Sequence, residues 1–518
     1  MHRKIKKRCI FFISKYNMFI FCIYINDTSH EGSFFMNIRY GTFLSFLCVL
    51  YSLFFFFKTK NFFLLAACFV FLFYLFFCCY VPRALLWLNK KTYSSNDCDF
   101  LHSAEKKSDF FCGFFTLLYA VIFILNIFIR RAPILSLSLV LFAASFAAFP
   151  QNLFFNAVLC INKYIKSMSK LKVKISLLSA ADDIIRSKTV VIDDFESFLN
   201  ISAVKNISKL KNIVLLTKKS EFETKKICSD FLNLVSFSDV SKNQPPIFSK
   251  EKPIVVYSSA SLNDILPLIQ KQNSTFLTVC QNKISSPFRI SENISDNTDI
   301  TFPQKDMLTL QSVFNCRTAM QKSFQNCFIY TLSLSFASFF FFTAILFLTG
   351  SFALSCVMFS LLPCICTLLP GVALACDTNK NSTFLYSKSD IFCHIILDSM
   401  LISVCCVLVF LIARFTFSPL CTQLICFNTF IISSLLYAFN IRSEKSVFLM
   451  GLLKNKAINF SFFFGICISV AASYFTSSKI LKNGETIGAG GWILICAMSL
   501  IPFALTQIQK ACTDIFKV

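Results

Sequence analysis

The chain contains few charged residues for its length. They make up 15% of its 518 residues, whereas hydrophobic residues make up 55% and the mean hydropathy is +0.65. Such an apolar composition excludes a soluble protein of this size and is typical of a protein that crosses a membrane several times. Phenylalanine alone occurs 67 times, and we expect it to supply much of the membrane-embedded surface.

Acidic residues are especially scarce, with 27 against 50 basic residues, so the formal net charge is +23. No basic stripe with interleaved aromatic residues lies outside the apolar segments, which argues against nucleic acid as a partner. The basic residues instead flank the apolar segments, where they fix the orientation of spans in a bilayer. The lipid bilayer is therefore the first partner that the sequence predicts.

The chain also lacks the pattern of a disulfide framework, although it contains 25 cysteines. Most lie within apolar runs, as Cys78-Cys79 and Cys405-Cys406 do, and free cysteine packs there as a small hydrophobic residue. Cys364 and Cys366 lie in one apolar run, where paired thiolates could bind a soft metal such as Cu(I). We favour packing for this pair, because no Cys-x-x-Cys module lies outside the apolar segments. No metal site is predicted.

Ten apolar segments are each long enough to cross a bilayer as a helix, which takes about 20 residues. They lie near residues 41–57, 61–81, 110–129, 132–156, 326–349, 352–376, 391–415, 418–438, 459–477 and 490–509. A short polar loop over 82–109 and a large hydrophilic region over 157–325 divide them into groups of two, two and six. Lys and Arg in the short loops favour the side of 157–325, which predicts that this region and both termini are cytoplasmic.

Residues 1–40 are expected to form an N-terminal extension. A basic start and a short apolar run over 9–25 resemble a signal segment, but no small-residue cleavage site follows. A second interpretation is that translation begins at Met36, because Glu31-Gly32 would be encoded by a sequence resembling a bacterial ribosome-binding site. The expected location is the bacterial plasma membrane, with the chain as an integral membrane protein.

The hydrophilic region alternates predicted strands with predicted helices. Apolar, β-branched strands are expected over 189–193, 212–217, 253–258 and 275–279, with helices over 221–232 and 263–271. This alternation predicts a parallel sheet covered by helices, in which ligands bind at the carboxyl ends of the strands. Those ends are Asp193, Thr217 and Ser258, which makes them candidate site residues.

Several short segments follow one another in a recognisable order. Pro150, Gln151 and Asn152 interrupt the fourth apolar segment, and a proline there frees backbone carbonyls that can bind an ion. The strand that ends at Asp193, the strand that ends at Thr217, the run VVYSSASLNDILPL over 255–268 and the run LPGVALA over 369–375 come next. In this order the segments resemble the P-type cation-transporting ATPases, and bacterial Ca²⁺- or Mg²⁺-type pumps in particular.

The resemblance implies a role for each of these positions. Asp193 takes the place of the phosphorylated aspartate of the family's DKTGT motif, and Thr217 that of the threonine of TGD. Asn263 and Asp264 take the place of the last residues of GDGVND. Pro150, Gln151 and Asn152 correspond to the ion-binding break in the fourth span, and Thr367 lies where relatives carry an ion ligand in the sixth.

The same segments depart from the family where its reaction needs particular residues. Phosphoryl transfer in the family uses an aspartate, a lysine and Mg²⁺ held by carboxylates. Here Asp194-Phe195-Glu196-Ser197 replaces KTGT, Lys218-Lys219 replaces the Gly-Asp of TGD, and Ala260 replaces the main Mg²⁺-binding aspartate. The actuator and nucleotide-binding domains have no counterpart, since 82–109 and 200–211 are too short for them.

The predicted architecture is a multispan α-helical membrane protein with one cytoplasmic α/β, HAD-like (Rossmannoid) domain. Its parts are 1–40, spans one to four over 41–156, the α/β domain over 157–325, and spans five to ten over 326–518. We expect Asp193, Thr217, Asn263 and Asp264 to be vestigial catalytic positions, with no cofactor where relatives use ATP and Mg²⁺. The predicted role is that of a scaffold, regulator or accessory component of ion transport that works with a membrane-protein partner.

Two alternatives stay open. The chain could be a working cation transporter, either driven by domains that a partner supplies or passive. It could also be an unrelated membrane protein whose α/β domain binds a partner.

Overall fold

The computed structural model describes most of residues 49–516. Its longer gaps are 91–98, 176–187, 194–200, 282–287, 292–299, 378–386, 443–454 and 478–485. Residues 1–48 lie outside the described part, and with them the predictions for the N-terminal extension and for Met36. Most of the predicted first span, 41–57, lies outside it too.

Nine helical segments of the described chain are long and apolar enough to cross a membrane. Their elements are α2 (Phe62–Leu75) with the π-helix η1 (Phe76–Tyr80) and α3 (Val81–Lys90), α4 (Asp99–Arg130), α5 (Ile134–Ala148) with α6 (Asn152–Lys170), α11 (Met307–Thr349), α12 (Cys356–Leu362) with the π-helix η4 (Pro363–Leu368) and α13 (Leu369–Ala375), α14 (Lys388–Thr416), α15 (Pro419–Ile441), α17 (Lys456–Ser477) and α18 (Ala489–Phe516). They confirm the second to tenth predicted spans.

The predicted polar loop over 82–109 is largely helical. The helix α3 ends at Lys90 and α4 begins at Asp99, so eight residues separate them. Leu101, Ala104 and Ser108 are buried at helical spacing in the first turns of α4, where that helix packs against α6. Their burial extends α4 beyond its apolar segment, which explains why hydropathy alone placed a loop here.

The α/β domain contains an eight-stranded sheet in the order β1-β8-β7-β6-β2-β3-β5-β4. The strands are β1 (Lys174–Ile175), β2 (Thr189–Ile192), β3 (Asn212–Leu216), β4 (Val235–Ser238), β5 (Ile254–Tyr257), β6 (Phe276–Gln281), β7 (Phe288–Ser291) and β8 (Ile300–Phe302). The five strands from β6 to β4 pair in parallel; the sequence predicts four of them, β2, β3, β5 and β6, but not β4. The strands β7, β8 and β1 add antiparallel pairs that the sequence analysis did not foresee.

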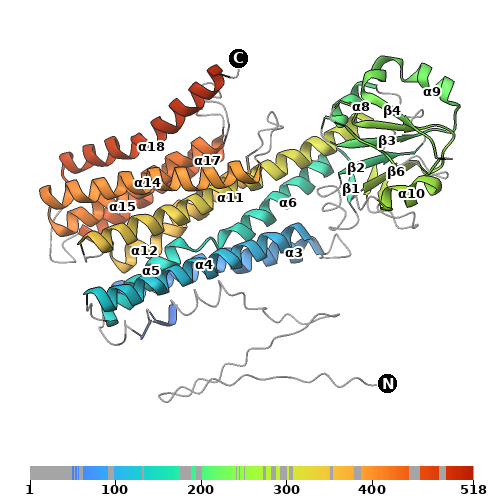
Figure 1. The fold of residues 1–518 in the computed structure, drawn as a ribbon. Coiled ribbons are helices and arrows are strands. Elements are labelled where there is room, and N and C mark those ends of the chain that lie inside the picture. The colour runs from blue at the N-terminus through green and yellow to red at the C-terminus, as the bar shows by residue number, and fades with distance from the viewer. Residues whose placement is uncertain are drawn as a thin grey trace, which may run out of the picture.

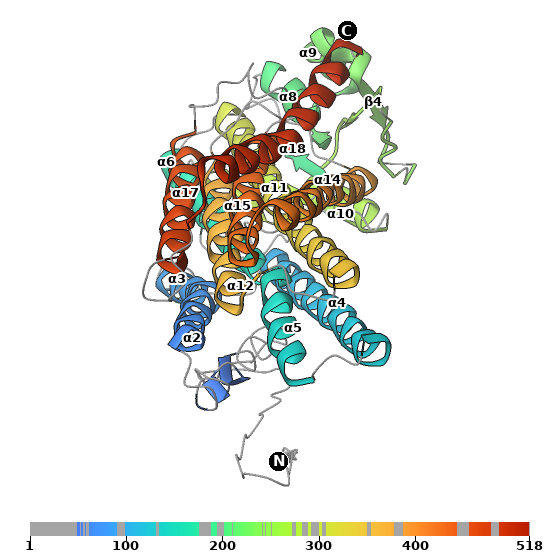
Figure 2. The same ribbon diagram turned by 90° about the vertical axis from the view of Figure 1, so that its left-hand side faces the viewer.

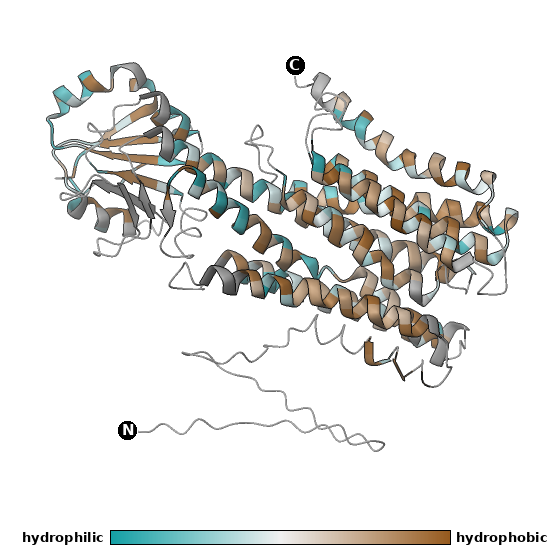
Figure 3. Cartoon of the chain, turned by 180° about the vertical axis from the view of Figure 1, so that it is seen from behind, coloured by the Kyte–Doolittle hydropathy of each residue, from teal (hydrophilic) through white to brown (hydrophobic). Residues whose placement is uncertain are grey.

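The parallel strands β2, β3 and β5 are buried on both faces, because helices cover them. The covering elements include α8 (Ile201–Ser208), α9 (Glu221–Ile227), the 3₁₀-helix η3 (Ser229–Leu234) and α10 (Leu262–Lys271). Val191 and Val214 pack with Ile265 and Ile269 of α10, whereas Val190 and Ile213 belong to the core on the opposite face. Because successive side chains of a strand point to opposite faces, the sheet separates two apolar cores, one on each face. Figure 3 shows the apolar strands among more polar helices.

Two helices, α6 and α11, run from the membrane bundle to the α/β domain (Figure 1). The helix α11 has 43 residues, which at 1.5 Å per residue is about 65 Å, roughly twice the hydrocarbon thickness of a bilayer. Viewed along the bundle, α4 and α5 lie on one side of α11 and α12, and α14, α15, α17 and α18 lie on the other (Figure 2). The helix α11 is therefore central to the bundle and continuous with the domain.

Candidate functional site

The first candidate site lies at the carboxyl ends of the parallel strands. In the sheet β2 has β3 and β6 as its neighbours, and β5 lies on the far side of β3. Asp193 directly follows β2 and is half-buried, and Thr217 directly follows β3 and is fully buried. The strand ends that carry Asp193, Thr217 and Ser258 therefore follow one another along one edge, as predicted for a parallel sheet.

Backbone hydrogen bonds join the Thr217 loop to the Ser258 loop. The Thr217 amide donates to the Tyr257 carbonyl at 3.2 Å, and the Ala260 amide donates to the Thr217 carbonyl at 3.1 Å. The Thr217 Oγ1 accepts from the Lys219 amide at 3.1 Å, which turns the chain outward. Lys218 and Lys219 are consequently exposed, and this edge presents two cations where the resemblance would place a glycine and a carboxylate.

Ser259 has a φ of 53°, in the left-handed region that a non-glycine residue enters only in a tight turn. Its amide donates to the Lys219 carbonyl at 3.1 Å. The next residue, Ala260, is 3% exposed and offers a methyl group where the resemblance would place a carboxylate that binds Mg²⁺. A methyl group offers none of the oxygen ligands that Mg²⁺ needs.

Asp264 does not reach the end of β2. It lies in the first turn of α10, after β5, and adjacent strands are about 4.8 Å apart, so β5 is roughly 10 Å from β2. Its carboxylate accepts from the Ser261 amide at 3.0 Å and from the Ser261 hydroxyl at 2.5 Å. These hydrogen bonds hold the pKa of Asp264 below its ordinary value and make the residue a helix cap. The side chain of Asn263 and residues 194–197 lie outside the described part.

The second candidate site lies in the fourth span, which is broken as predicted. The helix α5 ends at Ala148 and α6 begins at Asn152. Pro150 has no amide proton for the Phe146 carbonyl, which accepts instead from the Phe149 amide at 3.2 Å. The Pro150 carbonyl accepts from the Ser108 hydroxyl at 3.0 Å. Gln151 is also buried, with 5% of its surface exposed.

Asn152 and Thr367, predicted separately, come together. The Asn152 Nδ2 donates to the Thr367 carbonyl at 2.9 Å and approaches Thr331 Oγ1 of α11 at 3.5 Å. The Thr367 hydroxyl itself donates to the Pro363 carbonyl at 2.7 Å. All three side chains are buried. The start of α6, the π-helix η4 and the middle of α11 therefore converge on one polar cluster inside the membrane.

Asn156 belongs to the same cluster, although the sequence analysis did not select it. It lies one turn after Asn152, has no exposed surface, and neither Nδ2 nor Oδ1 has a hydrogen-bond partner among the described residues. Asn152 Oδ1 also lacks one there. An unsatisfied buried polar group costs about 1–3 kcal/mol. The sequence offered one signal for Asn156: it lies four residues after Asn152, and this spacing places both amide side chains on one face of the helix.

Gly371 allows this cluster to form. A Cβ at this position in α13 would lie 2.7 Å from Asn156 Nδ2 and 3.0 Å from Asn152 Nδ2. The Cys366 carbonyl has lost its helical partner, because residue 370 is proline, and it accepts from the Tyr330 hydroxyl at 2.6 Å instead. The π-helix between Pro363 and Pro370 thus has carbonyl groups that accept hydrogen bonds from side chains of other helices. π-Helices of this kind recur at functional sites.

The membrane cluster can offer neutral oxygen atoms to a cation. Amide oxygens, the Thr331 hydroxyl and backbone carbonyls are hard ligands, but no carboxylate belongs to the cluster as described. Within the described residues, no group of three or more His, Cys, Asp or Glu side chains is arranged to hold a metal ion.

A comparison with known families matches the last part of the chain. Residues 378–512 match the family described as Cation transporting ATPase, C-terminus, which covers 135 of the 518 residues. The matched part spans α14 to most of α18, the helices beyond the two candidate sites. No curated protein matches the chain. The chain is thus a membrane protein whose last four described spans are related to this family.

Proposed function

We propose that this protein is a P-type ATPase homologue that does not hydrolyse ATP and acts as a membrane scaffold or accessory component of ion transport. The observation that carries the proposal is the edge of the sheet at Asp193. There the buried Ala260 and the exposed Lys218 and Lys219 stand where a pump needs Mg²⁺ ligands. Without such ligands, no Mg²⁺ is held to bridge the transferred phosphoryl group and neutralise the charge that develops on it.

The connections between elements support the same proposal. Between β2 and β3 lie 19 residues, 193–211, which include α8. Between α3 and α4 lie eight residues, 91–98. Neither connection is long enough for a domain of even 50 residues. The connection 193–211 is therefore too short for a nucleotide-binding domain, and the connection 91–98 is too short for an actuator domain.

The basic residues of the short loops support a cytoplasmic α/β domain, in a bacterial plasma membrane. The continuous helix α11 then carries contacts from the cytoplasm into the bilayer. In the scaffold role that we propose, a membrane-protein partner binds this protein, and α11 connects the partner's contacts in the bilayer with the α/β domain.

The test is phosphorylation of the purified full-length protein with labelled ATP and Mg²⁺. We expect no acid-stable phosphoenzyme, and no difference between the wild type and Asp193→Asn. Label on the wild type that disappears in Asp193→Asn would contradict the proposal. The second measurement is the melting temperature with excess Mg-ATP. A real ATP site would stabilise the protein by about 2.7 kcal/mol at 100 times its Kd. Because we propose that there is no such site, we expect Mg-ATP to leave the melting temperature unchanged.

A second candidate function is passive or partner-driven cation transport, and Asn156 favours it. The buried amide oxygens of Asn156 and Asn152 have no hydrogen-bond partner among the described residues, and such oxygens are suitable ligands for a cation. Flux of Na⁺, K⁺, Mg²⁺ and Ca²⁺ into proteoliposomes should fall at least 10-fold in Asn156→Ala. The matched control is Asn428→Ala, because Asn428 is equally buried but bonds Ser473 at 2.7 Å and Ser469 at 2.6 Å. Equal flux in Asn156→Ala and the wild type would reject this candidate.

A further inference from the structure

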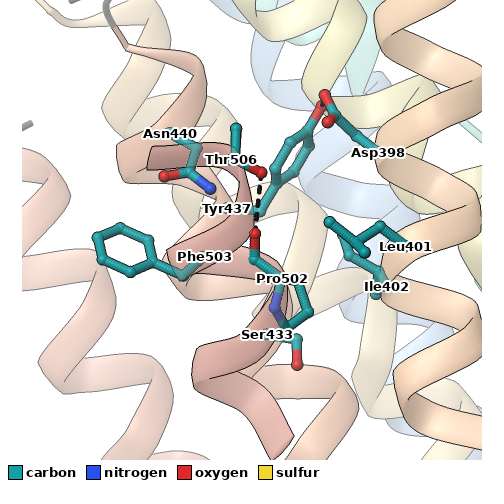
Figure 4. A pocket seen from close by; sticks show the side chains of 9 residues that line it. All are labelled: Asp398, Leu401, Ile402, Ser433, Tyr437, Asn440, Pro502, Phe503 and Thr506. Atoms are coloured by element: carbon teal, nitrogen blue, oxygen red, sulfur yellow. Dashed lines mark hydrogen bonds between the residues drawn. The ribbon is translucent and has the colours of Figure 1, made fainter. Parts of the chain in front are cut away.

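A carboxylate lies inside the bundle, away from both candidate sites. Asp398 is in the third turn of α14, and its side chain is only 12% exposed. The pocket around it is lined by α14, α15 and α18, with Ser433, Asn440 and Thr506 among its polar residues (Figure 4). A charge within a membrane span is expensive and usually has a function.

Three titratable groups face Asp398, each from a different position. His394 is one turn earlier on α14, with Nδ1 3.9 Å from Asp398 Oδ2, and its side chain is 39% exposed. Lys510 of α18 attracts the carboxylate electrostatically and donates to the Asn440 carbonyl. Tyr437 of α15 places its hydroxyl 2.8 Å from Asp398 Oδ2. From α11, the facing group is the Ser333 hydroxyl, 3.0 Å from the Tyr437 hydroxyl.

Tyr437 has one hydroxyl proton and two oxygen neighbours. It can donate to Asp398 or to Ser333, but not to both at once. When Asp398 is a carboxylate it only accepts, so Tyr437 donates to it and Ser333 donates to Tyr437. When Asp398 is a neutral acid it can donate to Tyr437, which then donates to Ser333. The carboxylate therefore fixes the direction of this hydrogen-bond chain, and only the neutral acid can reverse it.

We propose that Asp398 is a proton-binding site, loaded from water through His394, and that proton binding reverses the Asp398–Tyr437–Ser333 hydrogen-bond chain. One proton passes from the protonated His394 imidazolium to an Asp398 oxygen once Nδ1 closes from 3.9 Å to hydrogen-bond distance, and the neutral imidazole that remains takes up a proton from the surrounding water. The hydroxyl protons of Tyr437 and Ser333 only reorient, so neither residue changes its charge. This inference goes beyond the proposed function and involves neither ATP nor the α/β domain.

The hydrogen-bond chain from Asp398 ends at Ser333 on α11, the helix that links the membrane bundle to the α/β domain. Ser333 lies on α11, two residues from Thr331 of the membrane cluster. The ring of Tyr330 on the same helix stacks on Tyr437, with centroids 5.7 Å apart and planes 18° apart. The helices α11 and α14 are also packed along each other. Protonation of Asp398 thus changes the bonding of a residue in the centre of α11.

The test is infrared difference spectroscopy of the full-length protein in lipid nanodiscs between about pH 9 and about pH 5, a range that includes the ordinary titration of histidine. We expect acidification to produce a carbonyl band of a protonated carboxyl that is lost in Asp398→Asn. Tyr437→Phe should keep this band but shift it to higher frequency, because the carboxyl loses its hydroxyl partner. His394→Gln should slow its appearance after a pH jump at least 10-fold.

The matched control is Asp390→Asn, which removes an exposed carboxylate from the same helix while leaving a residue that can also cap it. It should keep the band. An unchanged band in Asp398→Asn would overturn the proposal, as would a wild type with no band beyond those of exposed carboxyl groups. If Asp398→Asn does not yield folded protein, Asp398→Glu replaces it. We then expect the pH midpoint of the band to move, and an unmoved midpoint would overturn the proposal.

Discussion

Replacing Gly371 with alanine should destabilise this protein, although the same change stabilises most helices. Alanine is about 1 kcal/mol more favourable than glycine in a helix interior. Here, however, the added Cβ would lie 2.7 Å from Asn156 Nδ2 and 3.0 Å from Asn152 Nδ2, both closer than carbon and nitrogen atoms pack. Asn156 has no exposed surface into which it can move, and Asn152 is bonded to the Thr367 carbonyl at 2.9 Å.

The sign follows from these magnitudes. Forcing an extra carbon into a packed interior costs about 1–3 kcal/mol, and loss of the Asn152 hydrogen bond costs about 1 kcal/mol more. Set against a helical gain of about 1 kcal/mol, the net loss is about 1–3 kcal/mol. Thermal unfolding in lipid nanodiscs measures it. The control is Gly490→Ala in α18, where the nearest atom to a new Cβ is Phe417 Cζ at 3.9 Å. A Gly371→Ala protein as stable as Gly490→Ala would refute the close approach of α13 and α6.

Three further predictions concern stability. Lys211 is 5% exposed, and burial lowers its pKa to about 6, with Arg317 adding to the effect. Above about pH 6 the unfolded chain therefore binds a proton at Lys211 that the folded chain does not. The melting temperature should rise with pH up to the ordinary lysine range, and it should rise less in Lys211→Met. Arg442→Met should cost about 3–5 kcal/mol in thermal unfolding, because the nearly buried Asp377 loses its 2.9 Å partner; a loss below that of an exposed pair such as Glu221–Lys225 would contradict it. Val191→Ala, in a strand with no exposed surface, should cost about 2 kcal/mol and leave the α/β domain more open to protease; unchanged proteolysis would contradict the two-sided core.

Apolar length and β-branched alternation were sufficient for the architecture. The nine described spans and four of the five parallel strands follow from patterns that act locally, since a bilayer needs about 20 apolar residues and a buried strand needs a short apolar run. The amphipathic ends of α3 and α4 escaped this reasoning, because Leu101 and Ala104 are buried by packing within the protein and not by an apolar run long enough to indicate a span. The strands β1 and β8 have only two and three residues, too few to show an alternation, and β1 pairs with β8 far along the chain. The strand β7, with four residues, also escaped it.

The membrane cluster was half predictable. Pro150 pointed to a break and Asn152 to a polar group inside it, since proline removes a backbone donor wherever it occurs. Asn156, Thr331 and Gly371 gave no comparable signal alone. An asparagine, a threonine and a glycine are common in membrane helices, and their importance arises only when α6, α11 and α13 approach within hydrogen-bond distance.

By itself, the sequence determined that this is a membrane protein with an α/β domain. These properties depend on which residues are present and in what order. Only the tertiary structure decided that Asp264 caps its own helix, that Asn156 lacks a described partner, and that Asp398 bonds Tyr437. Each of these depends on distances between helices or strands, and packing of the whole chain sets those distances.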